Sequence, residues 1–311
     1  VASAAPKAPA ASLAPAATRV EATPAVRALA KELGVALERV TGSGPSGRIT
    51  ADDVRAAAGA PAGRAAGAQA AAPAEEGVQR VPLRGLRRKI AEHMRRSLST
   101  AAQFTFVAEC DFTQVVEHRA QVASRAQSAG AKLTFLAYVF RALPAVLREF
   151  PHLNASLDDE RQEVVLRSHI HLGLATATDE GLTVPILHDA DRLGLFDVAR
   201  AIERLATAAR EHKLKLTELQ GGTFTVTSTG AKGGVLATPI LHHPQVAILG
   251  VHSITKKPAV VRDQIVARDL GNLSLSLDHR VVDGAVGADF LYALIERLQS
   301  PAAWLTETDL Q

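Results

Sequence analysis

Several residue types are scarce in this 311-residue chain, and each scarcity excludes a class of protein. Cys110 is the single cysteine, so no internal disulfide can form, and no Cys/His set has the spacing of zinc ligands. This cysteine usage predicts a reducing compartment. No apolar run reaches the roughly 18 residues that a membrane helix needs, so we expect no membrane association.

A strong charge imbalance is also missing. Lys and Arg number 35 against 32 Asp and Glu, which gives a formal net charge of +3. Because nucleic-acid-binding chains usually carry a marked basic excess, we expect no nucleic-acid partner. Neither GxGxxG after a strand nor GxxxxGK[ST] occurs, so nucleotide phosphate binding by those two devices is not supported.

Two stretches contain almost no large side chains. Residues 1–20 and 58–79 consist mainly of Ala and Pro. Proline stiffens such segments and alanine leaves little to bury, so both are predicted to be extended linkers. They divide the chain into a small unit at 21–57 and a large unit at 80–311.

The small unit has the pattern of a two-helix, all-α domain. Thr23 can cap a first helix that begins at Pro24 and ends at Gly34. Thr50 and Asp53 are spaced as in a capping box and predict the start of a second helix. The apolar stripe predicted for the first helix comprises Val26, Leu29, Ala30 and Leu33.

Docking is the predicted role of this small unit. It is too small for a catalytic pocket, and it carries no aromatic residue on which a base could stack. Its basic residues instead favour an electrostatic surface for an acidic partner. They are Arg27, Lys31, Arg39 and Arg48.

The large unit alternates helical and extended patterns. Predicted helices cover 84–99, 112–128, 134–149, 196–212 and 285–299. Predicted strands cover 103–110, 169–177, 182–187, 222–228, 245–253, 258–268 and 272–278. Several strands follow one another near the end, which favours a mixed α/β sandwich over a repeating βαβ arrangement.

DHRVVDG, residues 278–284, contains the main candidate for acid–base chemistry. It follows NLSLSL, residues 272–277, whose alternation predicts a strand with one buried face. His279 is therefore expected near a strand end, where the sheet holds the backbone still and a side chain reaches the rim of a pocket. It is either a general base or a histidine in a polar turn, with Asp283 as the cap of the next helix. The heptad alone leaves both interpretations open.

GGTFTVTSTGAKGG, residues 221–234, predicts a strand that enters a glycine-rich loop. Three hydroxyls lie where the strand meets the loop, at Thr227, Ser228 and Thr229. A hydroxyl there could donate to a developing oxyanion. The alternative is ordinary strand threonines followed by turn glycines.

Taken in order, these segments resemble the dihydrolipoamide acyltransferase component of 2-oxo acid dehydrogenase complexes. VRALAKELGV, GSGPSGRIT and DDV resemble its peripheral subunit-binding domain, at residues 21–57. VPLRGLRRKIAEHM, PHLNASL, DEGLTVPIL, GGTFTVTSTGAKGG, PQVAILGV and DHRVVDG resemble its catalytic core, at residues 80–311. The resemblance implies a mixed-sheet α/β core like that of chloramphenicol acetyltransferase. No lipoyl domain is found, and because the chain opens at Val1, inside a linker, we expect a fragment that lacks it.

The resemblance implies a reaction and residues for it. The family moves an acyl group between a dihydrolipoyl-lysine arm and coenzyme A. His279 would remove the proton of the coenzyme A thiol, and Thr227, with Ser228 as the fallback, would donate to the tetrahedral oxyanion. Asp283 would hold the loop through a salt bridge. Arg87 would pair with Asp283 or with a coenzyme A phosphate, although a basic helix face is more often only solvated.

Partners also follow from the resemblance. Arg27 and Arg48, supported by Lys31, would bind dihydrolipoamide dehydrogenase or the thiamine-dependent 2-oxo acid decarboxylase. Ala28 stands at a position that is often basic in the family, which puts partner preference in doubt. The core would form homotrimers whose active sites lie between subunits, and the trimers would build a cubic or dodecahedral core.

Some alternatives stay open. The chain could be a non-catalytic tethering component of such a complex, or a free-standing coenzyme A-dependent acetyltransferase, although an intact DHRVVDG and a docking unit favour the enzyme of the complex. TSTGAKGGV and ATPILHHPQ look slightly closer to branched-chain than to acetyl or succinyl versions, which does not settle the acyl group. We expect a cytoplasmic protein of bacterial type, or a mitochondrial-matrix protein in a eukaryote.

Overall fold

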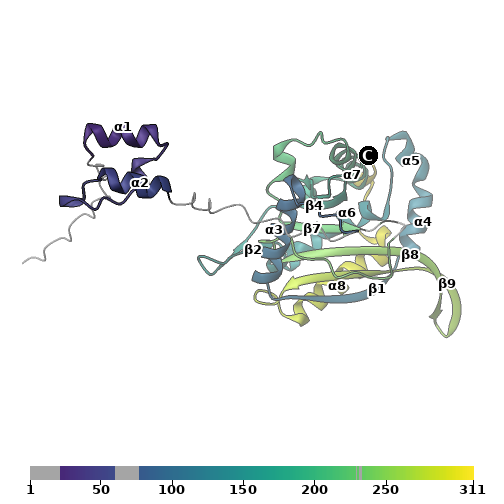
Figure 1. Cartoon of the computed structure of the whole chain (residues 1–311). Coiled ribbons are helices and arrows are strands. Elements are labelled where there is room, and N and C mark those ends of the chain that lie inside the picture. The colour runs from purple at the N-terminus through teal and green to yellow at the C-terminus, as the bar shows by residue number, and fades with distance from the viewer. Residues whose placement is uncertain (1–21, 60–76, 229, 231–232) are drawn as a thin grey trace, which may run out of the picture. The chain divides into compact units, whose positions relative to one another are not determined.

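The computed structural model describes residues 22–59, 77–228, 230 and 233–311. The chain divides into two compact units, Val1–Arg80 and Val81–Gln311 (Figure 1). The predicted linker at 1–20 and most of the one at 58–79 lie outside the described residues. Among the helices of the described ranges, none is long and apolar enough to cross a membrane.

The small unit contains the two predicted helices, α1 (Pro24–Glu32) and α2 (Ala51–Gly59), with the 3-10 turns η1 (Leu37–Arg39) and η2 (Pro45–Gly47) between them. Its core consists of Val26, Ala30, Ile49 and Val54. Leu33 was wrongly predicted as part of the buried stripe. It caps α1, one residue beyond the end of the helix, and is 43% exposed.

The predicted capping box at the start of α2 is present. The Asp53 carboxylate accepts hydrogen bonds from the backbone N–H of Thr50 (2.9 Å) and of Ser43 (3.0 Å), and from the Ser43 hydroxyl (2.7 Å). The backbone bonds from Ser43 and Thr50 favour the charged form and hold the pKa of Asp53 well below its usual range. One carboxylate thus ties the glycine-rich loop to the second helix.

The large unit is built on a mixed seven-stranded sheet, as predicted. The strand order is β1-β9-β8-β7-β4-β5, and β6 also pairs with β4. Strand β7 is parallel to β4 and β8, and the remaining pairs are antiparallel. The strands are β1 (Gln103–Asp111), β4 (Leu172–Ala177), β5 (Leu182–Thr183), β6 (Ile186–Leu187), β7 (Phe224–Ser228), β8 (Ala247–Val261) and β9 (Gln264–Asp278). A separate hairpin consists of β2 (Ala155–Asp158) and β3 (Glu163–Leu166).

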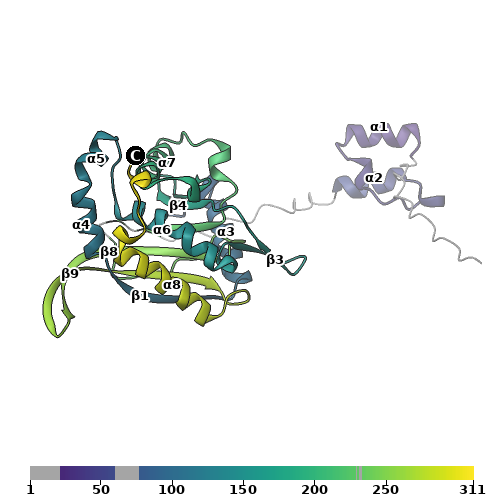
Figure 2. The same cartoon turned by 180° about the vertical axis from the view of Figure 1, so that it is seen from behind.

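Helices cover the sheet, and α8 lies along one of its faces (Figure 2). The helices are α3 (Gly85–Thr100), α4 (Thr113–Gln121), α5 (Ala123–Ser128), α6 (Phe135–Glu149), α7 (Leu195–Arg210) and α8 (Gly284–Gln299). Short 3-10 turns are η3 (Pro151–Leu153), η4 (Ala190–Arg192), η5 (Leu216–Leu219), η7 (Pro301–Ala303) and η8 (Glu307–Leu310).

Several observed elements differ from the prediction, and the predicted strand 182–187 is split into β5 and β6. The predicted strand 258–268 contains a turn, because Arg262 and Asp263 have positive φ and join β8 to β9 as a two-residue hairpin. The predicted helix 112–128 is interrupted at Val122, between α4 and α5. The β2–β3 hairpin was not predicted at all.

The core lies between the sheet and helices α6, α7 and α8. Phe224 and Val226 of β7 point into it, and the rings of Phe224 and Phe290 of α8 are 6.0 Å apart. Because strand side chains alternate, Thr225 and Thr227 point to the opposite face of the sheet. Cys110 of β1 is completely buried in the core, and burial raises the pKa of its thiol.

Candidate active site

His279 lies directly after the last residue of β9, in the turn that leads to α8. Its backbone N–H donates to the carbonyl of Ala102, just before β1, at 2.9 Å. Its imidazole packs against the Phe104 ring at a tilt of 42°, with 4.6 Å between centroids, and its side chain is 49% exposed. The ring is therefore supported on one side and open to a ligand on the other.

Asp283 contributes little to holding that ring in one chain. Its carboxylate is 4.0 Å from Nδ1 of His279, and its side chain is 86% exposed. It occupies the N-cap position of α8 without a side-chain capping bond. Arg87 lies elsewhere, with its guanidinium beside Gly181 in the turn between β4 and β5. Within the described residues the structure gives Asp283 no salt bridge to Arg87, because α3 places Arg87 at that other turn.

Asp278, which had no role assigned from the sequence, holds the histidine turn together. Its carboxylate is only 3% exposed. It accepts hydrogen bonds from the backbone N–H of Ala102 (3.2 Å) and of Arg280 (3.1 Å), and from the Arg280 guanidinium (2.6 Å to Nη2). Burial alone would raise the pKa of Asp278, but the bonds from Arg280 outweigh it and lower the pKa. The turn is thus built around a buried, ionised carboxylate.

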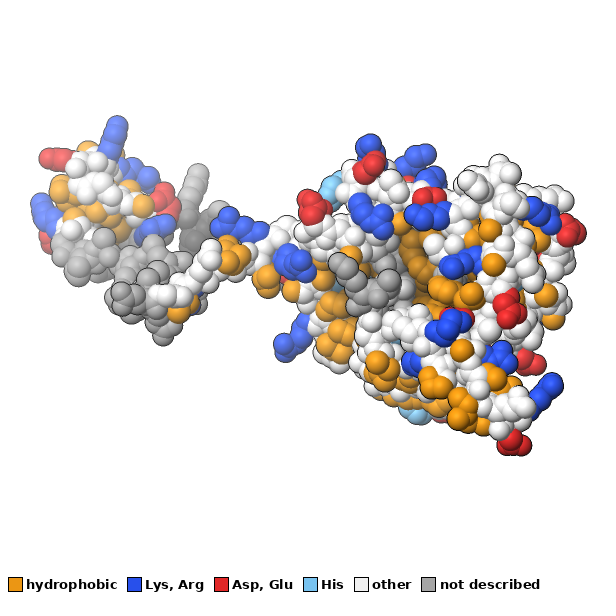
Figure 3. All heavy atoms as spheres, turned by 90° about the vertical axis from the view of Figure 1, so that its right-hand side faces the viewer, with side chains coloured by type: hydrophobic (Ala, Val, Ile, Leu, Met, Phe, Trp, Pro, Cys, Tyr) orange, Lys and Arg blue, Asp and Glu red, His pale blue; other side chains and the backbone are white. Residues whose placement is uncertain are grey.

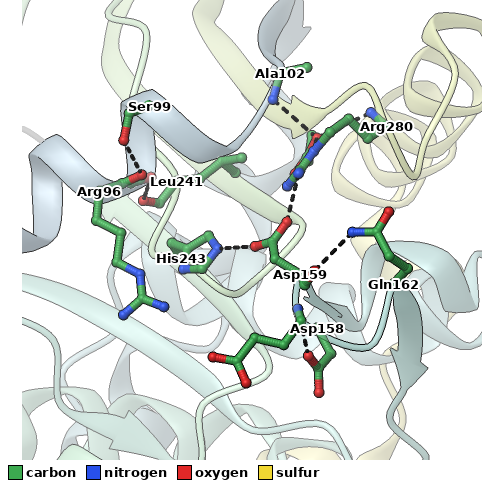
Figure 4. A network of polar contacts seen from close by, with 12 residues as sticks. Arg96, Ser99, Ala102, Asp158, Asp159, Gln162, Leu241, His243 and Arg280 are labelled. Carbon is green, nitrogen blue, oxygen red and sulfur yellow. Dashed lines mark hydrogen bonds and ion pairs between the residues drawn. The ribbon is translucent and has the colours of Figure 1, made fainter.

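Arg280 extends this network to the β2–β3 hairpin (Figure 4). Its Nη1 donates to Asp159, in the hairpin turn, at 2.7 Å. Asp159 also accepts a hydrogen bond from Nε2 of His243 at 3.0 Å. The bond from His243, followed by that from Arg280, lowers the pKa of Asp159. Arg280, the residue that follows His279, is therefore bonded directly to Asp159 and linked through Asp159 to His243.

The candidate hydroxyls, Thr227 and Ser228, point to opposite faces of β7. Both are half-buried. Ser228 accepts a hydrogen bond from the Gly230 N–H at 3.2 Å and lines a cavity of about 560 Å³ on the helix side. The cavity walls include Leu136, Thr176, Ile202, Arg210 and His252. A hollow with an apolar floor and basic side chains around it is visible in Figure 3. Thr229 lies outside the described residues.

Two polar residues that the sequence did not single out lie near Thr227. Thr227 pairs with Gly250 of β8, and Gly250 pairs with Ser274 of β9. A Cβ at Gly250 would collide with the Ser274 hydroxyl, so a larger residue there would force that hydroxyl to move. The Ser274 hydroxyl is 2.8 Å from Nε2 of the buried His252, whose pKa burial lowers. The serine alternation in SLSL was the sequence signal for this polar face.

The strand register places Thr227 and His279 far apart within one chain. Thr227 is level with Ser274, two strands away, and His279 follows Ser274 by five residues. With strands about 4.8 Å apart and about 3.3 Å per residue, the Cα atoms are roughly 10 Å apart across the sheet and roughly 16 Å apart along it. A ligand carbonyl that accepts a hydrogen bond from Thr227 therefore lies too far from His279 of the same chain to be attacked by a thiol that this imidazole deprotonates.

The predicted docking residues are all exposed. Arg27 and Lys31 are one turn apart on α1, and Nε of Arg27 donates to the carbonyl of Ala22 at 3.3 Å. Arg48 lies just before Ile49, a core residue of the small unit. An exposed basic surface of this kind suits the binding of an acidic protein.

Comparison with known proteins gives both units a family. Residues 75–306 match the 2-oxoacid dehydrogenases acyltransferase (catalytic domain), and residues 20–55 match the e3 binding domain. The class is therefore an acyltransferase that carries a separate binding domain. The chain belongs to the 2-oxoacid dehydrogenase acyltransferase family, and it is a dihydrolipoyllysine-residue acyltransferase of such a complex.

Relatives from two bacteria illustrate the match. The lipoamide acyltransferase component of the branched-chain alpha-keto acid dehydrogenase complex of Pseudomonas putida is 42% identical over 286 residues, which is 92% of this chain and 68% of that protein. The dihydrolipoyllysine-residue acetyltransferase component of the pyruvate dehydrogenase complex of Bacillus subtilis is 41% identical over 304 residues, 93% of this chain and 69% of that one.

Solved structures agree on the core fold. A probable dihydrolipoamide acetyltransferase from Listeria monocytogenes has a TM-score of 0.68 at 37% identity and covers 72% of this chain and 95% of its own. The cubic core of the pyruvate dehydrogenase multienzyme complex has a TM-score of 0.70 at 34% identity. The match covers 73% of this chain and 93% of the chain in that structure. The predicted fold class and acyltransferase function are confirmed.

Proposed function

We propose that this chain moves an acyl group between coenzyme A and a dihydrolipoyl-lysine arm carried on a domain outside it, in active sites that neighbouring subunits of a homotrimer build together. The observation that carries the proposal is the separation of Thr227 from His279 in one chain. A second copy, which presents its own His279 to Thr227 of its neighbour, would bring the two groups together.

In this proposal His279 acts as the general base. A thiol of pKa about 8.5 is mostly protonated near neutral pH, and the thiolate is the nucleophile. The half-exposed imidazole takes the proton of the coenzyme A thiol. The sulfur then attacks the carbonyl carbon of the acyl-dihydrolipoyl thioester, and the carbonyl electron pair moves to oxygen. When the oxyanion collapses, the dihydrolipoyl sulfur leaves and takes the proton back from the imidazolium.

Thr227 would stabilise the negative charge that develops on the carbonyl oxygen. Its hydroxyl, on a strand held from both sides by β4 and β8, donates to the oxyanion. Ser228 faces the helix side and is the weaker candidate. For Arg87 and Asp283, the remaining proposals are a contact with a coenzyme A phosphate and a contact across the subunit interface, since neither pairs with the other in one chain.

Assembly and docking complete the proposal. Trimers would associate into a larger core, and the relative whose structure is a cubic core favours a cubic over a dodecahedral arrangement. Arg27, Lys31 and Arg48 would bind dihydrolipoamide dehydrogenase, which the match to an e3 binding domain supports, or the thiamine-dependent decarboxylase. The bacterial origin of the relatives named above supports a cytoplasmic, bacterial-type location.

The acyl group is proposed to be branched-chain, on the basis of the 42% identity to the Pseudomonas putida protein. The Bacillus subtilis acetyltransferase is almost as similar, at 41%. One methylene in a pocket is worth only about 1 to 3 kcal/mol, so selectivity has to be measured. Turnover of isobutyryl-, acetyl- and succinyl-coenzyme A with free dihydrolipoamide decides it, and a preference for acetyl-coenzyme A would contradict the branched-chain assignment.

Subunit complementation tests the shared site. His279→Ala and Thr227→Ala chains, each nearly inactive alone, are co-expressed in equal amounts and purified as mixed assemblies. If neighbours share each site, about one quarter of the sites in a randomly mixed trimer combine an intact histidine with an intact threonine. We expect turnover near that fraction of wild type. Mixed assemblies as inactive as either parent would place both groups in one chain and end the proposal.

A further inference from the structure

The imidazole of His279 has few direct supports of its own. In the described part of the chain these are the Phe104 ring, at 4.6 Å between centroids, and the Asp283 carboxylate, at 4.0 Å from Nδ1. The second distance is too long for a hydrogen bond. The direction of the ring is therefore set mainly by the backbone of its turn, and whatever fixes that turn also fixes the base.

The turn is fixed by the residues on both sides of His279. Asp278 accepts hydrogen bonds from two backbone N–H groups, and its own carbonyl accepts from the N–H of Val281 and of Val282. Arg280 binds the same carboxylate through Nε and Nη2, at 2.9 and 2.6 Å. A buried carboxylate without its cation is costly, so the turn geometry depends on where Arg280 is held.

Arg280 is held at its other end by Asp159. The 2.7 Å bond from Nη1 to Asp159 crosses 121 positions of sequence and reaches the β2–β3 turn (Figure 4). Asp159 is in turn fixed by His243, which bonds its second oxygen at 3.0 Å. The guanidinium therefore lies between two carboxylates, one inside the turn and one on a separate hairpin.

We propose that Asp159 is a positioning residue for His279, acting through Arg280 and Asp278, and that His243 orients the Asp159 carboxylate. The inference is built on the proposed function, because it assigns His279 the role of base. Asp159 touches no reacting atom in this proposal. It fixes the outer end of the guanidinium, so that the bidentate contact with Asp278 and the backbone turn between them keep one geometry during turnover.

Asp159→Asn is the first test, with Glu160→Gln as its matched control. Glu160 is the next residue of the same turn, is exposed, and its side chain makes no hydrogen bond or ion pair within the described residues. Asp159→Asn should lower kcat about tenfold and leave KM for coenzyme A within about twofold, because an ill-placed base slows the chemical step and not binding. Glu160→Gln should match wild type. A wild-type kcat for Asp159→Asn would overturn the inference.

A second set of variants separates positioning from general destabilisation. His243→Gln keeps a side-chain N–H near the position of the imidazole Nε2 that bonds Asp159, and should retain most of kcat, whereas His243→Ala should lose as much as Asp159→Asn. In a His279→Ala background, Asp159→Asn should cause no further loss of residual turnover, since there is no imidazole left to place. A lower residual turnover in the His279→Ala/Asp159→Asn double variant than in His279→Ala would contradict the positioning role of Asp159. Equal kcat in the two His243 variants would contradict the orienting role of His243.

The proposed function and the positioning role of Asp159 are contradicted by different results. Wild-type protein that forms its assembly but transfers no acyl group from any acyl-coenzyme A would end the proposed function. An active wild type whose Asp159→Asn variant is equally active would end only the inference about Asp159. Melting curves of all variants show whether folding contributes, and a kcat loss that follows the loss of folded protein would count against positioning.

Discussion

The imidazole of His279 packs at a tilt against the ring of Phe104, and the two centroids are 4.6 Å apart. An aromatic contact of this kind is worth about 0.5 to 1.5 kcal/mol beyond its buried area. We expect Phe104→Leu, which keeps an apolar side chain on β1 but removes the ring, to lower kcat about threefold to tenfold. Steady-state kinetics measure this. A kcat above that of wild type would mean that the contact with Phe104 holds the imidazole in a less productive position.

Thr227 and Ser228 should differ sharply although they are neighbours. Thr227→Val removes the hydroxyl at constant shape and should lower kcat by about 10² to 10³, the usual effect of losing one oxyanion donor. Thr227→Ser should recover most of that loss. Ser228→Ala, on the helix side, should stay within a few fold of wild type. The reverse ranking in single-turnover experiments would move the oxyanion donor to Ser228.

Acid should destabilise the large unit through the partly buried His171. His171 packs against His169 and His188, with centroids 5.0 and 4.6 Å away, and burial, followed by repulsion from the His188 side, lowers its pKa. The unfolded chain takes up a proton at about pH 6.5, whereas folded His171 resists it. The free energy of unfolding therefore falls as pH drops below about 6.5, towards the lower folded pKa. Stability at higher pH is unaffected by this group.

Calorimetric Tm values at pH 7.5 and 5.5 measure this effect. His171→Asn should show a smaller drop in Tm between the two pH values than wild type. His152→Asn, at an exposed histidine whose ring makes no hydrogen bond, ion pair or ring contact within the described residues, is the matched control and should show the same drop as wild type. Equal drops in wild type and His171→Asn would assign the acid sensitivity to other groups.

Partner binding should depend on the basic residues of the small unit. Reversing charge at Arg27, Lys31 and Arg48 together should weaken binding of dihydrolipoamide dehydrogenase at least tenfold at low salt, because the surface then repels an acidic partner. The difference should shrink as salt screens the charges. Titration calorimetry with Arg262→Glu, at the exposed tip of the β8–β9 hairpin, gives the charge control. Tight binding by the triple variant would move the docking surface elsewhere.

The fold could be predicted from sequence where local patterns determine it. The alternation in NLSLSL predicted the strand that ends before His279, and the Thr50–Asp53 spacing predicted the start of α2. The β8–β9 hairpin was misread because its turn, Arg262–Asp263, contains none of the glycine or asparagine that usually marks positive φ. β-propensity continues through both strands, and only the pairing of one against the other reveals the turn.

The site could be predicted only in part, for a different physical reason. His279 and Thr227 occur in short motifs, so the residues were found, but their separation is a property of strand order, which no local pattern contains. The link from Arg280 to Asp159 spans 121 positions and depends on an unpredicted hairpin. The salt bridge between Arg87 and Asp283, which the resemblance implied, does not form in one chain, because the packing of α3 places Arg87 beside another turn.

The burial of Cys110 has a chemical consequence for an enzyme that handles thioesters. An activated acyl group exchanges with any accessible thiolate, and a protein sulfur would hold it as a dead-end adduct. This chain has a single cysteine, placed where no acyl donor reaches it, and its raised pKa keeps the sulfur protonated. The acyl group can therefore pass between the two substrate thiols without being trapped on the cysteine of this chain.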